Sequence, residues 1–214
     1  MQFKLQLIQH KNALVVVVKI YYILIYIYIY IYMNPRKLLP SNENPFDNIL
    51  YIIIEKIEHF FYKLNFTPNM ITTLSLIFSI LSTYYLFNNN TQIATICYLL
   101  SYFFDCLDGY YARKYNMVTE VGDWYDHITD IIGIIGLYYI FFIKKKYISI
   151  IISLFFAVLL LIHMGCQEKI FSNTKSPSLN ILKLLCSNTK NIKYTRWCGC
   201  GTYTLVNIIL ILIN

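Results

Sequence analysis

The sequence predicts an all-α, polytopic integral membrane protein with about five to six transmembrane helices plus an N-terminal interfacial amphipathic helix. One reason is composition, since 57% of the 214 residues are hydrophobic, only 14% are charged and the mean hydropathy is +0.52. The other is that apolar stretches of about 20 residues, the length that crosses a bilayer as a helix, recur along the chain. The length suits one domain.

Residues 1–32 differ from the rest of the chain and form a separate low-complexity segment. Isoleucine and tyrosine alternate from Ile25 to Tyr32, and a simple TA-repeat DNA would be translated into such a run. We interpret the segment as a mis-assigned start, with Met33 as the working start, or as an extra membrane anchor that is long enough to span. A signal peptide is the third alternative, although the segment lacks a small-residue cleavage site.

Residues 33–66 are predicted to form a loop followed by an interfacial helix. Three prolines interrupt the first part, because proline disfavours a continuous helix. From Phe46 to Leu64, apolar residues are interspersed with charged ones. This stretch is too charged to span a bilayer and is typical of an amphipathic helix at the membrane surface.

The remaining residues, 67–214, are predicted to be one membrane domain. Four stretches are close to bilayer length, and an Asn88-Asn89-Asn90 turn separates the first two. After them come only a short apolar stretch, 178–186, and about half a span at Tyr203–Ile213. The four predicted spans are Ile71–Phe87, Thr91–Leu107, Val121–Ile143 and Tyr147–Met164.

Four carboxylates stand at helical spacing inside this apolar domain. Asp105 and Asp108, and likewise Asp126 and Asp130, are three or four residues apart, so each pair shares a helix face. A turn around residues 113–121 would fold the second pair back against the first. Close anions in an apolar setting are costly unless cations neutralise them. Oxygen ligands without Cys or His suit Mg²⁺ or Mn²⁺ bound to substrate phosphates, so the spacing predicts metal-dependent phosphate chemistry at a membrane.

The pattern D-x2-D-G-x2-A-R-x8-G-x3-D-x3-D, from Asp105 to Asp130, resembles the signature of the CDP-alcohol phosphatidyltransferase family (class I) at every fixed position. Residues Thr67–Thr72 are similar to the P-N-x-I-T segment that opens the first helix of this family and lines its CDP pocket. The alternative, solvated helix ends with ordinary surface aspartates, is disfavoured because the flanks are apolar. The resemblance implies a transferase of substituted phosphate groups. It would move a phosphatidyl or phospho-alcohol group from a CDP-linked donor to an alcohol acceptor, with release of CMP, in phospholipid biosynthesis.

The resemblance also implies a role for each matching residue. Two Mg²⁺ or Mn²⁺ ions would be bound, with Asp105 and Asp126 placed to bridge them and Asp108 as a further ligand. Asp130 would complete the second metal site and act as the catalytic residue that takes the proton of the acceptor hydroxyl. Residues implied to bind the CDP donor are Pro68, Asn69, Met70, Ile71, Gly109, Arg113 and Thr119.

The distribution of charge predicts which membrane face carries this chemistry. Both aspartate pairs lie at one face, and most Lys and Arg residues of the connecting segments fall there too. The positive-inside rule therefore places the active site in the cytosol, although Lys144-Lys145-Lys146 on the opposite face argues against this orientation. The sequence does not indicate which membrane holds the protein.

The expected partners are the CDP-linked donor, the alcohol acceptor and membrane lipid, with a homodimer left open. The net charge of +7 fits loops that face anionic lipid. Nucleic-acid binding is not expected, because no aromatic and basic residues are arranged for it.

Most of the cysteine and histidine residues are interpreted as structural. The six cysteines show no paired framework, and Cys97, Cys106 and Cys166 in apolar stretches are interpreted as buried small hydrophobes. His127, next to Asp126, has two interpretations. It is either an acceptor-recognition or proton-relay residue, similar to the choline and ethanolamine phosphotransferase branch, or an interfacial imidazole.

Two classes of function stay open. The leading one is a phospholipid-synthesising transferase, and the other is a catalytically weak or inactive family member that acts as a membrane scaffold or partner protein. The four aspartates favour the enzyme, whereas the short C-terminus favours the scaffold, since family members usually have six spans. A transporter or channel would not require Gly and Ala-Arg at fixed spacing. Donor choice divides between CDP-diacylglycerol and molecules of the CDP-choline type.

Overall fold

The computed structural model describes residues 35–171 and 178–214, together with Lys19, Tyr21 and Tyr22. The chain divides into two units, residues 1–35 and 36–214. The alternatives for residues 1–32 concern positions that, apart from those three, lie outside the described residues. Every regular element in the described residues is helical, which confirms the all-α prediction.

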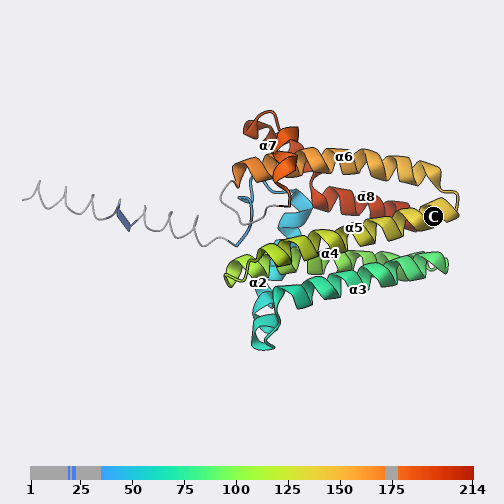
Figure 1. Ribbon diagram of the computed structural model, residues 1–214, viewed down its shortest axis with the longest axis horizontal. Helices are drawn as coiled ribbons and strands as arrows, with labels where there is room; N and C mark the ends of the chain where they lie inside the picture. The colour runs from blue at the N-terminus through green and yellow to red at the C-terminus, as the bar shows by residue number, and fades with distance from the viewer. Residues whose placement is uncertain (1–18, 20, 23–34, 172–177) are drawn as a thin grey trace, which may run out of the picture. The chain divides into compact units, whose positions relative to one another are not determined.

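The second unit is a bundle of long helices with α2 lying across one end (Figure 1). In this view α3, α4, α5, α6 and α8 run along a common direction, and α2 crosses that direction. The helices are α2 Pro45–Lys63, α3 Pro68–Phe87, α4 Thr91–Lys114, α5 Glu120–Ile143, α6 Tyr147–Ile170, η1 Asn180–Leu185, η2 Thr189–Asn191, α7 Ile192–Thr195, η3 Arg196–Cys198 and α8 Cys200–Leu212.

Local sequence explains where the helices begin and end. Asn44 and Thr67 cap the starts of α2 and α3, and each is followed by a proline, which suits the first helical position. At the other ends, asparagine tolerates the left-handed conformation that terminates a helix better than most residues do. The residues with this conformation after α2, α3 and α4 are Asn65 (φ 55°), Asn89 (φ 61°) and Asn116 (φ 55°).

Three helices in the described part of the chain, α3, α5 and α6, are long and apolar enough to cross a membrane. They correspond to the predicted spans at residues 71–87, 121–143 and 147–164. The stretch predicted as a span at residues 91–107 lies in α4, which has 24 residues but carries acidic and basic side chains toward its C-terminus. The last helix, α8, has 13 residues. The structure thus supports a helical membrane protein, and the total of five to six spans stays a prediction.

The helices that carry the aspartates pack against α3 through small residues. Ser75 of α3 donates a hydrogen bond to the carbonyl of Ser101 in α4 (2.9 Å). On the other side, a Cβ added at Gly133 of α5 would lie only 2.4 Å from Oγ of Ser79. Small residues at such positions let membrane helices approach closely. Helix α3 therefore holds α4 and α5 in a fixed relation, which positions the aspartates.

Helix α2 has the mixed surface expected of an interfacial helix. Ile54 is fully buried, whereas Ile49, Ile52 and Ile53 are exposed. The buried carboxylate of Glu58 accepts hydrogen bonds from Lys114 and, at 2.6 Å, from the hydroxyl of Tyr115. These bonds attach α2 to the C-terminal end of α4. Contact of the exposed face with a membrane surface stays a prediction.

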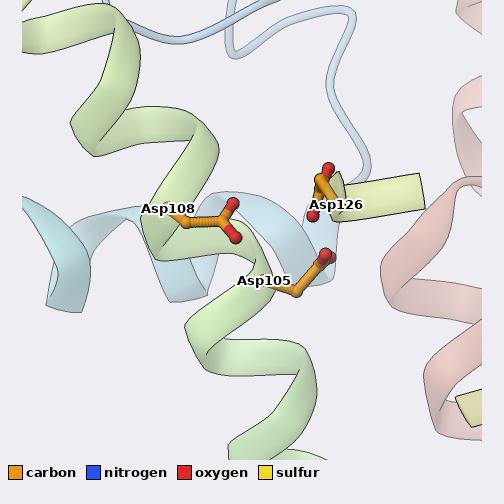
Figure 2. Close-up of side chains that lie close together, drawn as sticks. All are labelled: Asp105, Asp108 and Asp126. Carbon is orange, nitrogen blue, oxygen red and sulfur yellow. The ribbon is translucent and has the colours of Figure 1, made fainter. Parts of the chain in front are cut away.

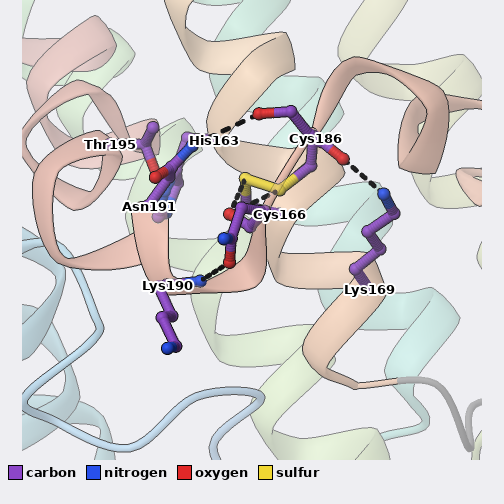
Figure 3. The surroundings of a disulfide bond; sticks show 9 residues. His163, Cys166, Lys169, Cys186, Lys190, Asn191 and Thr195 are labelled. Atoms are coloured by element: carbon purple, nitrogen blue, oxygen red, sulfur yellow. Dashed lines mark hydrogen bonds between the residues drawn. A yellow bond between two sulfur atoms is a disulfide. The ribbon is translucent and has the colours of Figure 1, made fainter.

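The region between α6 and α8 is irregular and contains a disulfide. Cys166 near the end of α6 is bonded to Cys186 after η1 (Figure 3). The interpretation of Cys166 as a free buried hydrophobe is therefore wrong, and so is the absence of any cysteine pairing. The two cysteines meet only because η1 folds back on α6, which local sequence does not reveal. Cys97 is buried and free, as predicted.

The loop before α2 packs on this disulfide region. Leu38 forms a buried apolar cluster with Cys166, Cys186 and Ile192. Next to it, Lys37 donates a hydrogen bond to the buried carboxylate of Glu168 in α6. The N-terminal loop of the second unit is thus anchored to the C-terminal part of the bundle.

Candidate active site

Three of the four predicted aspartates meet at one end of the bundle (Figure 2). Asp105 and Asp108 lie one turn apart in the C-terminal part of α4, and Asp126 comes from the N-terminal part of α5. Each offers one carboxylate oxygen, and these oxygens all lie within 4.8 Å of one another. The connection between α4 and α5 therefore folds the second pair of aspartates back on the first, as the spacing predicts.

Asp130 lies one turn after Asp126 on α5 and is the most accessible of the four. Its carboxyl group lies beside that of Asp105, but it does not belong to the three-oxygen cluster of the described residues. The residue is exposed, whereas Asp105 and Asp126 are half-buried and Asp108 is buried. Asp130 therefore stands beside the three-oxygen cluster, next to Asp105, without belonging to it.

The cluster fits a divalent metal ion. Oδ1 of Asp126 is buried and has no hydrogen-bond partner, and Asp108 is only 3% exposed. A buried acceptor without a partner costs about 1–3 kcal/mol, and the neighbouring carboxylates repel one another. A bound cation would offset both costs. Because the cluster contains neither Cys nor His, its ligand chemistry suits Mg²⁺ or Mn²⁺.

Thr72 supports this cluster, a role that was not predicted from the sequence. Its hydroxyl donates a hydrogen bond to Oδ2 of Asp108, and it also lies 3.1 Å from the carbonyl of Pro68. The carboxylate is the stronger acceptor because it carries charge. Thr72 is buried, so it fixes the direction in which Asp108 offers its other oxygen. Its position in the P-N-x-I-T segment was the signal that could have identified it.

The start of α3 and the start of α5 touch each other at the site. Thr119 caps α5, because its Oγ1 accepts a hydrogen bond from the backbone N of Gly122 (3.0 Å). A Cβ added at Gly122 would lie 3.0 Å from this oxygen and 3.1 Å from Oδ1 of Asn69. Glycine therefore lets the two predicted nucleotide-binding segments meet. Contacts of Pro68, Asn69 and Thr119 with a nucleotide stay predictions.

The other predicted donor-binding residues differ in how accessible they are. The side chain of Ile71 is fully buried in a cluster with Leu107 and other residues, so only its backbone could face a ligand, whereas Met70 is exposed. A Cβ added at Gly109 would lie 3.2 Å from Nη1 of Arg113. Glycine in the signature thus leaves room for the arginine guanidinium to fold back over α4.

A network of polar residues, Asp123, His127 and Ser178, lies beside Asp126. The hydroxyl of Ser178, just before η1, donates a hydrogen bond to Oδ2 of Asp123. The Nδ1 of His127 donates to the carbonyl of Asp123 (2.6 Å) and lies 3.4 Å from the Ser178 hydroxyl. His127 thus belongs to a network that connects α5 to the C-terminal region. The sequence could not reveal this network, because its members are far apart along the chain.

Two more carboxyl groups, Glu43 and Asp47, are buried where α2 meets α4. Asp47 accepts a hydrogen bond from the hydroxyl of Tyr102, one turn before Asp105 on α4. Burial above all, together with the charge of Glu43, raises the pKa of Asp47 to about 7, although the hydrogen bond from Tyr102 lowers it. Burial also raises the pKa of Glu43. The sequence predicts a loop at Glu43 and a surface helix at Asp47, since nothing local shows that both residues become buried.

The fold and the cluster define a class of protein, a helical membrane protein with an acidic site suited to a divalent metal. A family model for CDP-alcohol phosphatidyltransferase matches residues 65–212, which is well over half of the chain. The chain belongs to the CDP-alcohol phosphatidyltransferase family, as the resemblance of its signature indicated. Members of this family transfer a phosphatidyl-type group from a CDP-alcohol and use a divalent metal.

One relative among known proteins is an "Uncharacterized protein" of Aquifex aeolicus (strain VF5). It is 35% identical over 78 residues, which make up 36% of this chain and 40% of that protein. The matched part of the chain therefore spans less than half of that relative's length. No solved structure matches this chain.

Proposed function

We propose that the protein transfers a phosphatidyl or phospho-alcohol group from a CDP-linked donor to the hydroxyl of an alcohol acceptor in phospholipid biosynthesis. The observation that carries this proposal is the convergence of three carboxylate oxygens within 4.8 Å in a member of this family. In the reaction, a bond forms between the acceptor oxygen and the β-phosphorus of the donor. The bond from that phosphorus to CMP breaks, and CMP leaves with the electron pair.

The four aspartates would share the tasks of holding the metal and moving the proton. Asp105, Asp108 and Asp126 would hold Mg²⁺ or Mn²⁺, with Asp130 completing a second metal position. When bound, such ions neutralise the charge of the diphosphate and align it. Asp130, whose carboxyl group lies beside that of Asp105, takes the proton of the attacking hydroxyl.

Other residues of the chain bind and orient the donor. Arg113 offers a guanidinium that can pair with a phosphate through two hydrogen bonds. The adjoining starts of α3 and α5, with Asn69 and Thr119, present polar atoms to the nucleotide. Thr72 holds Asp108 in one orientation, so the ligand geometry does not have to be reorganised during the reaction.

The active site is proposed to face the cytosol, with the protein in the membrane as a multi-pass chain. The positive charge of the connecting segments supports this orientation. Formation of a homodimer also stays a proposal. Crosslinking of the protein in the membrane would test it.

The first test is an assay with membranes that contain the full chain. Labelled CDP-diacylglycerol is offered with a panel of alcohol acceptors, and CDP-choline and CDP-ethanolamine are offered with diacylglycerol. Transfer should vanish on chelation, return with Mg²⁺ or Mn²⁺, and be abolished by Asp105→Asn or Asp126→Asn. Glu120→Gln, an acidic position at the start of α5, is the matched control and should stay active. Full activity in chelator contradicts the proposal, and no transfer with any pair favours the scaffold alternative.

The second test separates the proton acceptor from a metal ligand. Asp130→Asn keeps an oxygen but cannot take the proton, so donor binding should survive while turnover falls by about 10²–10⁴-fold. Asp108→Asn should instead weaken metal-dependent donor binding, and extra Mg²⁺ should partly restore it. Donor affinity and turnover are measured across a metal titration. If added metal rescues Asp130→Asn as well as Asp108→Asn, Asp130 is not the base.

A further inference from the structure

The segment from residue 180 to residue 198 exposes large apolar side chains, although it is not a transmembrane helix. It consists of η1, η2, α7 and η3, none of which exceeds six residues. The exposed side chains include two aromatic rings. They are Ile181 (72% exposed), Leu184 (84%), Leu185 (49%), Tyr194 (79%) and Trp197 (57%).

These side chains are spaced so that they can act in pairs. Ile181 and Leu184 are three residues apart in η1, and side chains at this spacing eclipse one another in a 3₁₀ helix. Tyr194 and Trp197 have the same spacing across α7 and η3. Ile181 and Leu184 therefore form an exposed aliphatic pair, and the guanidinium of Arg196 lies over the ring of Trp197, 5.3 Å from its centroid.

The same segment is basic throughout. It contains Lys183, Lys190, Lys193 and Arg196, and no Asp or Glu follows Glu168 in the sequence. Lys190 and Lys193 are exposed. An apolar surface that also carries positive charge is complementary to a surface of apolar and negative groups together, which is the chemistry of an anionic lipid headgroup region.

The backbone of the segment fixes the depth at which it can lie. Short 3₁₀ turns leave backbone N–H and C=O groups without partners inside the helix, and such groups are not tolerated against hydrocarbon. The exposed Leu184 and Trp197 favour removal from water. The segment joins the end of α6 to the start of α8 (Figure 1), so it lies where a membrane-crossing helix leaves the bilayer. The headgroup region is the depth at which the backbone groups find partners, the apolar side chains leave water and the end of α6 is close. Tyr and Trp are enriched at this depth.

The segment is held rigidly to the bundle. The Cys166–Cys186 disulfide joins it to α6, Lys169 donates a hydrogen bond to the carbonyl of Cys186, and His163 contacts Thr195 (Figure 3). Ile192 is buried beneath it. The disulfide and the hydrogen bonds therefore hold the exposed side chains in a fixed position on the bundle.

We propose that residues 180–198 form a membrane-surface element that binds anionic phospholipid headgroups. Leu184, Tyr194 and Trp197 enter the headgroup region, and Lys190 and Lys193 contact the lipid phosphates. This surface contains none of the residues assigned to phosphoryl transfer, so it is a binding site separate from the proposed reaction.

The proposal is tested with the fluorescence of Trp197. The chain has two tryptophans, and Trp124→Phe leaves Trp197 as the sole reporter. The full chain is reconstituted into vesicles of phosphatidylcholine and phosphatidylserine, in which either lipid carries bromine high on its acyl chain. Brominated phosphatidylserine should quench Trp197 more than brominated phosphatidylcholine at the same mole fraction. Each lysine near the surface should contribute up to about fivefold to this preference at low salt.

Two matched variants complete the test. Lys190→Gln/Lys193→Gln should remove most of the preference for the anionic lipid. Lys145→Gln/Lys146→Gln removes the same charge from exposed positions at the opposite end of the bundle and should leave the preference unchanged. Equal quenching by the two lipids or an unchanged preference in Lys190→Gln/Lys193→Gln would each overturn the proposal. None of these readouts depends on transferase activity, so the result stands apart from that of the assay above.

Discussion

Residues 65–143 and residues 178–199 are held in their structures by different kinds of contact. The first region is three regular helices with capped starts, asparagine at two of the helix ends and small residues between the helices. The second is a series of short turns, joined to α6 by a disulfide and to Leu38 by apolar packing. One region is specified by neighbours in sequence, and the other by contacts between distant parts of the chain.

This difference separates the parts of the molecule that perform chemistry from those that support it. The aspartates, Thr72 and Gly122 all lie in the regular region, where rigid helices hold side chains precisely. The irregular region contributes Ser178 to the edge of the site but none of the four aspartates. Changes in the first region should therefore affect metal binding and turnover, and changes in the second should affect stability.

The largest effect on stability is expected from the disulfide. Cys166→Ala/Cys186→Ala should lower the free energy of unfolding by about 2–4 kcal/mol, because the cross-link no longer restricts the unfolded chain. A reductant should lower the melting temperature of the native chain in detergent and leave that of the variant unchanged. Cys97→Ala, at a buried free cysteine, is the control and should keep the sensitivity to reductant. A native chain whose melting temperature ignores the reductant would contradict the prediction.

The disulfide also bears on which end of the bundle faces the cytosol. It lies at the same end of the bundle as the aspartates, since Ser178 of the adjoining segment bonds to Asp123. Stable disulfides belong mainly to oxidising compartments, whereas the basic segments predict the cytosol for this end. Accessibility of Lys190→Cys to an impermeant thiol reagent, compared with that of Lys145→Cys, decides which end faces which compartment.

A smaller, purely functional effect is expected at Thr72. Thr72→Val removes the hydrogen bond to Asp108, and loss of such a bond behind a metal ligand typically costs about 10–100-fold in metal affinity or activity. The Mg²⁺ concentration for half-maximal transfer should rise accordingly, with little change in melting temperature in chelator. Thr72→Ser retains the hydroxyl and should behave like the native chain. Equal Mg²⁺ requirements for the two variants would show that this hydrogen bond does not orient Asp108.

The smallest effect is expected from replacing a glycine by alanine, a substitution that can be made at a contact of each region. A Cβ at Gly165 would lie 2.2 Å from the backbone carbonyl of Leu182, whereas one at Gly133 would meet the rotatable hydroxyl of Ser79. Gly165→Ala should therefore destabilise by about 1–3 kcal/mol, as overpacking does, and Gly133→Ala by less. Adding Ser79→Ala should rescue Gly133→Ala in thermal unfolding. Equal destabilisation at both sites would show that the backbone at Leu182 moves aside as easily as the side chain of Ser79.

The sequence alone determined the helical class, the positions of three apolar helices and the placement of the two aspartate pairs on helices joined by a short connection. These features follow from periodicity, composition and a short connection, so residues close in sequence suffice to specify them. The resemblance of the signature then supplied the family, which the match over residues 65–212 confirms.

Only the tertiary structure decided the rest. The disulfide, the burial of Glu43 and Asp47, and the network of Asp123, His127 and Ser178 all join residues from separate elements. Whether such groups become buried or paired depends on how the helices pack, because burial and pairing are properties of neighbours in space. The sequence placed the aspartates on their helices, and the packing of α4 and α5 on α3 decided that the oxygens of three of them converge.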